Sequence, residues 1–129
     1  MKSYDTQAAA RDLPTLTIES AMSGADPELS AKMLASFNQC TVGIMRFSGR
    51  TPWERHPDGD ELLHVLEGDV EVTVLAEAGP LEAVVAAGSI FVVPRGLWHR
   101  QVASTPTTLL FATALKGSEH SWAEDPPGP

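Results

Sequence analysis

Seven short segments between Thr41 and Leu115 have the length and the period-two patterning of strands, and this feature constrains the fold more than any other. Turn signals rich in Gly, Pro, Asp and Ser separate the segments, so the chain has no room there for crossover helices. Parallel strands need such crossovers, and the segments are therefore expected to pair as antiparallel strands. The pattern predicts an all-β sandwich or barrel. The predicted strands are TVGIMRF, DELLHVLEG, DVEVTVL, LEAVVAAG, SIFVVP, HRQVA and TLLFATAL.

The residues before Asn38 follow a different pattern. The first roughly 12 residues are small and polar, which predicts a loose arm, and LTIES predicts a short strand. In DPELSAKMLASF, Asp26 suits an N-cap and Pro27 a first helical position, and apolar residues recur at helical spacing up to Phe37, which predicts a short helix. The expected division is an N-terminal arm with a short helix over 1–37, a β-barrel over 38–116 and a C-terminal tail over 117–129.

Length and charge limit the function classes. A chain of 129 residues suits one domain with a real core. Its 17 acidic and 9 basic residues give a net charge of −8, which disfavours nucleic acid and anionic membranes as partners. No apolar run reaches the about 20 residues of a membrane span, and the N-terminus lacks the apolar region of a secretory signal. A cytoplasmic protein is therefore expected, and its single cysteine, Cys40, cannot form a disulfide within the chain.

Strand parity brings acidic and imidazole groups together around the turn PDGD. Glu54 and His56 point to one face of a short strand, and Glu61 shares a face with Leu63 and Val65 on the next strand. A carboxylate at the mouth of an apolar barrel needs a partner, because burying it unpaired is costly. We therefore expect this hairpin to aim an imidazole and two carboxylates at one point.

A second cluster follows the turn PRG, where His99 opens a strand and shares its face with Gln101. Two imidazoles and two carboxylates from three strands could then converge, and such a set suits a divalent transition metal of intermediate hardness. Without a metal, Glu54 and Glu61 would be like charges in a partly buried pocket, so one of them would hold its proton more tightly. Both carboxylates are therefore candidate catalytic groups.

These residues fall on two motifs, and through them the chain resembles the cupin superfamily of small jelly-roll barrels. The second half of the first motif, G-x5-H-x-H-x3–4-E-x6-G, is met from His56 to Gly68. The second motif, G-x5-P-x-G-x2-H-x3-N, is met from Gly88 to His99, although its last position holds Ala103. The resemblance covers roughly residues 40–115 and implies a cupin-like jelly-roll β-barrel. Together with the helix predicted from the spacing, the expected fold is all-β, a cupin-like jelly-roll β-barrel with a short N-terminal helix.

The resemblance also implies a ligand set. His56, Glu61 and His99 occupy three of the four metal-ligand positions of the family, and Glu54 stands where the family has its first histidine. A site with two glutamates and two neutral histidines carries about two negative charges. Such a site is harder than one with three histidines and favours iron or manganese, ahead of zinc or nickel.

Several functions stay open at this point. The resemblance implies a metal-dependent cupin that acts on a small organic molecule, with chemistry of the dioxygenase, isomerase, cyclase or lyase type. The alternatives are a metal-free acid–base enzyme and a non-catalytic small-molecule binding module. Cupins commonly form homodimers through the outer sheet, with which the apolar Leu62, Leu66 and Trp98 are compatible. The residues expected to line the substrate pocket are Arg46, Phe91, Gln101 and Phe111.

Overall fold

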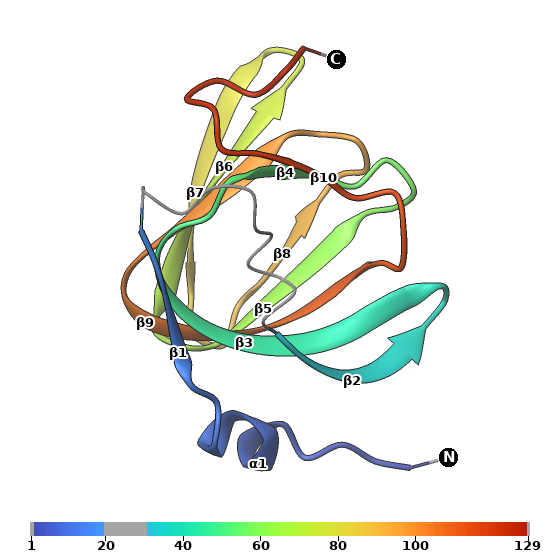
Figure 1. Ribbon diagram of the computed structural model, residues 1–129, viewed down its shortest axis with the longest axis vertical. Coiled ribbons are helices and arrows are strands. Elements are labelled where there is room, and N and C mark those ends of the chain that lie inside the picture. The colour runs from blue at the N-terminus through green and yellow to red at the C-terminus, as the bar shows by residue number, and fades with distance from the viewer. Residues whose placement is uncertain (1, 20–30, 129) are drawn as a thin grey trace.

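The computed structural model describes residues 2–19 and 31–128, and Figure 1 shows strands that curve around one interior with a small helix outside them. The all-β class with one short helix is confirmed. The elements are α1 (Thr6–Arg11), β1 (Thr15–Ile18), β2 (Lys32–Phe37), β3 (Cys40–Arg50), β4 (Trp53–Arg55), β5 (Glu61–Glu67), β6 (Asp69–Ala76), β7 (Gly79–Ala86), β8 (Ile90–Val93), β9 (His99–Ala114) and β10 (Glu119–Ser121).

The long strand β9 holds the two walls of the barrel together. Its first part pairs antiparallel with β6 and, through His99, with β4. Its second part pairs antiparallel with β3 on one side and with β5 on the other. The sequence predicts two strands here, separated by a turn at STP, and that prediction is wrong. Pro106 is tolerated inside β9 because the pairing with β3 shifts register nearby, where a missing ladder hydrogen bond costs little.

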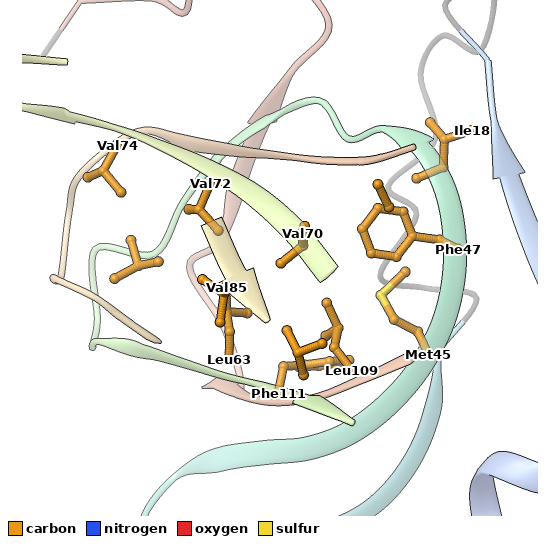
Figure 2. Packing of buried hydrophobic residues seen from close by; sticks show 13 residues of the cluster. Ile18, Met45, Phe47, Leu63, Val70, Val72, Val74, Val85, Leu109 and Phe111 are labelled. Carbon is orange, nitrogen blue, oxygen red and sulfur yellow. The ribbon is translucent and has the colours of Figure 1, made fainter. Parts of the chain in front are cut away.

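The interior is filled by alternate residues of the strands, as the period of two predicts. Leu63 and Val65 of β5 are buried with Glu61, whereas Leu62 and Leu66 on the opposite face are only half-buried. Figure 2 shows the interior side chains pointing toward one another from several strands. Because each residue inside contributes apolar area removed from water, this cluster supplies the main stabilisation of the barrel. The labelled members are Ile18, Met45, Phe47, Leu63, Val70, Val72, Val74, Val85, Leu109 and Phe111.

The N-terminal helix lies elsewhere than the sequence predicts. Residues 32–37 form the strand β2, which pairs antiparallel with β3. Asn38 and Gln39 between them have φ angles of 47° and 65°, the backbone of a tight hairpin turn, so sheet pairing overrides the helical spacing. The predicted N-cap at Asp26 lies outside the described residues. The helix is α1, in the segment predicted to be a loose arm, and the Asp5 side chain caps it by accepting from the Ala8 N–H.

The C-terminal residues add to the barrel. β10 pairs antiparallel with β4, beside which it lies in Figure 1. The Trp53 Nε1–H donates to the Glu124 carbonyl oxygen over 2.9 Å, and Trp122 packs against the interior cluster. The segment expected as a tail therefore closes over β4, the strand that carries Glu54.

The outer surface bears on two further expectations. Trp98 is buried under the Arg55 guanidinium, with Leu62 and Leu66 half-buried elsewhere, and the homodimer stays a prediction. No helix in residues 2–19 and 31–128 has the length and apolar character that a bilayer crossing requires.

Candidate metal centre

Four ionisable side chains from three strand regions meet at one point inside the barrel. Glu54 lies in β4 directly opposite His99, the first residue of β9, and His56 follows β4. Glu61 is the first residue of β5. The exposed fractions of the four residues are 4%, 1%, 3% and 0%, in that order. The turn from β4 to β5 and the start of β9 thus bring together the four residues that the sequence singles out.

The ligand atoms face one another at short range. His99 Nε2 lies 3.1 Å from Glu61 Oε1, and His56 Nε2 lies 3.4 Å from Glu61 Oε2 and 3.9 Å from Glu54 Oε2. The two imidazole rings are tilted by 47° with their centroids 5.2 Å apart. Glu61 therefore sits between the two histidines, and Glu54 approaches from the side of His56.

The hydrogen bond of His99 Nδ1 determines whether Nε2 of the same ring carries a proton. His99 Nδ1 lies 3.2 Å from the Leu97 carbonyl oxygen, and a carbonyl oxygen only accepts hydrogen bonds. Nδ1 therefore carries a proton, and in a neutral ring Nε2 is left with a lone pair that faces the Glu61 carboxylate. Two acceptors at 3.1 Å repel each other, so a proton or a metal ion has to lie between or beside them.

The surroundings orient His56 and Glu61 as well. His56 Nδ1 lies 2.8 Å from Ser118 Oγ, and its buried Nε2 has no hydrogen-bond partner. The Thr113 hydroxyl donates to Glu61 Oε2. Histidines that bind metals are typically held in this way through their other ring nitrogen, and ligating carboxylates are hydrogen-bonded in turn.

The charges within the cluster shift the pKa values of Glu61 and His99. Burial alone would raise the pKa of the Glu61 carboxyl, but the close polar contacts and positive charge of His56 and His99 outweigh it and hold that pKa well below its usual range. Burial alone would lower the pKa of His99, and the hydrogen bond and charge of Glu61, with the charge of Glu54, raise it instead. Both shifts favour a metal-free state in which an imidazolium at His99 neutralises Glu61.

The geometry fits a metal ion. An ion about 2.0–2.2 Å from nitrogen and oxygen ligands sets those ligands roughly 3–4 Å apart, which is the range of the distances to Glu61 and Glu54. Ligand atoms of Glu54, His56 and His99 all lie within 4.8 Å of one another. The orphaned Nε2 of His56 and the lone pair of His99 are then both satisfied by one ion. The assignment of the four ligands stays a prediction.

The residues expected in the substrate pocket divide into three groups. Gln101 and Phe111 line a small interior cavity of about 10 Å³ together with Glu54. Phe91 is half-buried and packs against the interior cluster. Arg46 lies away from the cavity, because it stands between Met45 and Phe47, which point inward.

Arg46 therefore faces the N-terminal arm, which corrects its placement in the pocket. Its guanidinium donates to the Thr108 hydroxyl and to the carbonyl oxygens of Leu13 and Ala10, at 2.8, 2.7 and 2.9 Å. These contacts tie the end of α1 to the outside of β3, so the charge of Arg46 serves the fold.

Three groups at the centre are absent from the sequence prediction. Thr113 shares strand parity with Phe111, so an inward orientation could have been inferred for it. The Leu97 carbonyl and Ser118 carry no comparable signal, because neither belongs to a motif. Ser118 is 62 residues away from His56 along the chain.

Comparisons with known proteins agree with the fold. The family model described as "Cupin domain" matches residues 43–113, more than half of the chain. "Germin-like protein subfamily 2 member 4" of Arabidopsis thaliana is 37% identical over 90 residues, which are 66% of this chain and 39% of that protein. The chain spans only 25% to 49% of the length of the germin-like relatives it matches.

Two solved enzymes share the architecture. Oxalate oxidase in complex with the substrate analogue glycolate is 26% identical, with a TM-score of 0.56, over 64% of this chain and 46% of that one. A hydroquinone 1,2-dioxygenase in complex with Cd²⁺ and 4-hydroxybenzonitrile has a TM-score of 0.58 at 22% identity, over 74% of this chain and 68% of that one, and it shares the fold. With the motifs, the jelly-roll strands and the family match in agreement, the chain belongs to the cupin family.

Proposed function

We propose that the protein binds a divalent transition metal through Glu54, His56, Glu61 and His99, and acts there on a small oxygen-bearing organic molecule. The observation that carries the proposal is His99 Nε2 facing the Glu61 carboxylate at 3.1 Å, with the orphaned Nε2 of His56 beside it. A buried cluster of this kind needs positive charge, because unpaired buried charge is costly, and one divalent ion would satisfy both imidazole nitrogens at once.

The donor set favours a hard ion. Two carboxylates balance the charge of a divalent ion, so iron or manganese is preferred, with zinc or nickel next. When bound, such an ion would supply a Lewis acid that polarises an oxygen of the substrate.

The chain's own residues would position the ion and the substrate. Thr113 holds one oxygen of Glu61, and the Leu97 carbonyl and Ser118 hold the two imidazole rings by their Nδ1 atoms. The amide of Gln101 reaches the interior cavity beside Glu54, and its buried Oε1 has no hydrogen-bond partner. This amide would bind a polar group of the substrate, and the apolar cluster would exclude water.

One comparison supports a small substrate. The free space beside Glu54, about 10 Å³, holds roughly one water, so an organic substrate would need the surrounding side chains to move. The oxalate oxidase that shares the fold binds glycolate, a two-carbon hydroxy acid. Oxidation or cleavage of a small carboxylate-bearing or hydroxylated molecule is therefore the reaction class we would test first.

The pair His99–Glu61 favours one second candidate, a metal-free acid–base enzyme. The raised pKa of His99 would let this ring donate a proton near neutral pH, with Glu61 as the anion that stabilises the imidazolium. In this version Glu61 is not the general base, because its lowered pKa makes it a weak one.

The decisive experiment is elemental analysis of untagged protein purified without added metal or chelator. The proposal predicts close to one transition-metal ion per chain and its loss in His99→Ala. The matched control is His64→Ala, an imidazole of β5 on the face opposite to Glu61, which should keep the ion. Glu54→Gln paired with the exposed Glu71→Gln tests the carboxylate in the same way.

Turnover then separates the remaining functions. The metal-loaded protein is assayed for oxygen uptake and product with oxalate, glycolate and hydroquinone. Activity lost in His99→Ala supports the metal enzyme. A chain that binds no iron, manganese, zinc or nickel would rule it out in favour of acid–base chemistry, and a loaded chain inert toward a broad metabolite panel would favour a binding module.

A further inference from the structure

A second polar site lies on the side of β4 and β9 that faces away from the metal centre. Arg100 stands between the inward-facing His99 and Gln101, so it points outward, where its guanidinium stacks on the Trp53 ring at 4.2 Å from the centroid. Arg50, the last residue of β3, pairs with Val102, and a residue pair in register projects to one face of the sheet. The two arginines are therefore neighbours on this outer face.

These side chains line a pocket of about 90 Å³. About 10–15 Å³ on this measure holds one water, so the pocket has room for a small tetrahedral or planar oxyanion. Its lining includes two guanidinium groups, two indole rings and two hydroxyl groups, from Arg50, Arg100, Trp53, Trp122, Ser121 and Thr51.

The guanidinium groups of the pocket have no short-range partner among the residues that the structure describes. Arg55 pairs with Glu119, and Arg46 donates three hydrogen bonds, whereas the side chains of Arg50 and Arg100 form no hydrogen bond or ion pair within residues 2–19 and 31–128. The charges of Glu124 and Asp125 act on Arg100 without forming an ion pair with it, and the charge of Arg50 acts in the opposite sense.

Two arginines side by side, without an ion-pair partner among the described residues, are unusual in a chain of net charge −8. Each keeps its proton at all ordinary pH values, so a bound anion would offset the repulsion between them, which Glu124 and Asp125 offset only from beyond ion-pair distance. The planar guanidinium fork matches the oxygens of phosphate and carboxylate groups, and the Trp53 ring holds the Arg100 guanidinium by stacking.

We propose that this pocket binds an oxyanion, the phosphate or carboxylate group of a small molecule, between the guanidinium groups of Arg50 and Arg100. The Ser121 hydroxyl is placed to donate a further hydrogen bond. A phosphate dianion should bind more tightly than a carboxylate, because its charge offsets both arginines. The site uses none of the four metal-centre residues and does not depend on the proposed function.

Indole N–H signals in NMR spectra report on the pocket directly, because Trp53 and Trp122 line it and Trp98 does not. The probes are inorganic phosphate and, separately, acetate, titrated at constant ionic strength. We expect saturable shifts of the Trp53 and Trp122 signals, with phosphate the tighter ligand, and no saturable shift of Trp98. Tighter binding of acetate would identify a carboxylate as the source while still supporting an oxyanion site. The absence of saturable shifts with both anions would overturn the proposal.

Variants localise the binding. Arg50→Gln and Arg100→Gln should each weaken phosphate binding about tenfold or more, the usual effect of losing a hydrogen bond to a charged group. Arg50 is exposed, so its replacement tests the site even if Arg100→Gln disturbs the stack on Trp53. The control Arg95→Gln removes the same charge from an exposed position outside the pocket and should change the affinity less than twofold. Equal weakening in Arg95→Gln would show unspecific attraction and refute the site.

Discussion

His99 Nε2 lies 3.1 Å from Glu61 Oε1, while Nδ1 of the same ring lies 3.2 Å from the Leu97 carbonyl oxygen. The carbonyl assigns the proton to Nδ1, so Nε2 can approach the carboxylate only as part of an imidazolium or beside a metal ion. The same contact therefore describes two states of the centre. In one a proton holds His99 and Glu61 together, and in the other the ion replaces that proton.

The metal-free protein should show a stability maximum in mildly acidic solution. The pKa of His99 is raised above its ordinary 6.5, so its contribution to stability is complete below about pH 6.5 and is lost as the pH rises through the raised value. The pKa of Glu61 is lowered from 4.5, so its contribution is present above about pH 4.5 and is lost only in strong acid. Thermal unfolding of chelator-treated protein from pH 4 to pH 9 checks this, with the highest Tm expected between about 4.5 and 6.5.

The stabilisation by a bound metal ion should increase with pH, whereas the stabilisation by protonated His99 decreases. Binding requires a neutral His99, so protons compete with the ion and the gain in Tm on adding manganese should grow from pH 6 to pH 8. In His99→Gln the metal-free protein should lose the decline in Tm on the alkaline side. A metal-free Tm that rises steadily up to pH 9 in the wild type would contradict the pairing of His99 with Glu61.

Thr113 is expected to position Glu61. Thr113→Val keeps the shape and removes the hydroxyl that donates to Glu61 Oε2, which leaves a buried carboxylate oxygen short of one partner. We expect a loss of about 2 kcal/mol in the free energy of unfolding and about tenfold to 100-fold weaker metal binding. Urea unfolding and a metal titration measure the two effects. Thr105→Val, the same change at an exposed position of β9, should leave both unchanged, and similar losses in the two variants would remove Thr113 from the site.

The fold could be predicted from the sequence wherever the pattern has a period of two. Parity placed Glu61 with the buried Leu63 and Val65, because alternate residues of a strand share a face whatever its partner is. The segments 32–37 and 104–106 were mispredicted for the opposite reason. There the conformation depends on which strand lies alongside, and neither helical spacing nor a turn signal contains that information.

The candidate site divides in the same way. Motif spacing identifies Glu54, His56, Glu61 and His99, because a short hairpin and a turn place them with little freedom. The contact between His56 and Ser118 joins residues 62 positions apart, which depends on how the C-terminal segment packs. Strand parity also bears on the residues expected in the substrate pocket. Because Met45 and Phe47 point into the interior, Arg46 between them has to point outward.

Gly49 is expected to tolerate substitution less well than Gly79 or Gly59. It has a φ of 104°, and an added Cβ would lie 2.1 Å from the Ile18 carbonyl oxygen, part of the backbone of β1. Gly49→Ala should cost about 3 kcal/mol or more of unfolding free energy, measured in urea. Gly79→Ala, with a φ of 124° and open space, should cost only the strain of about 1–2 kcal/mol, and Gly59→Ala should change little. If Gly49→Ala and Gly79→Ala reduce the free energy of unfolding equally, the close approach of the β1 backbone to Gly49 does not add to the cost of the substitution.

Glu54 should decide which ion the centre prefers. Glu54→His keeps a fourth ligand but lowers the negative charge of the donor set from about two to about one, and it adds a softer nitrogen. The affinity for manganese should therefore fall and the affinity for nickel or zinc should rise, and their ratio should change by at least about tenfold. Competition titrations with a chromogenic chelator measure this ratio in the wild type, in Glu54→His and in Glu71→His, which makes the same change at an exposed position of β6. If the ratio stays constant across all three proteins, Glu54 does not touch the ion, and the centre is held by His56, Glu61 and His99 alone.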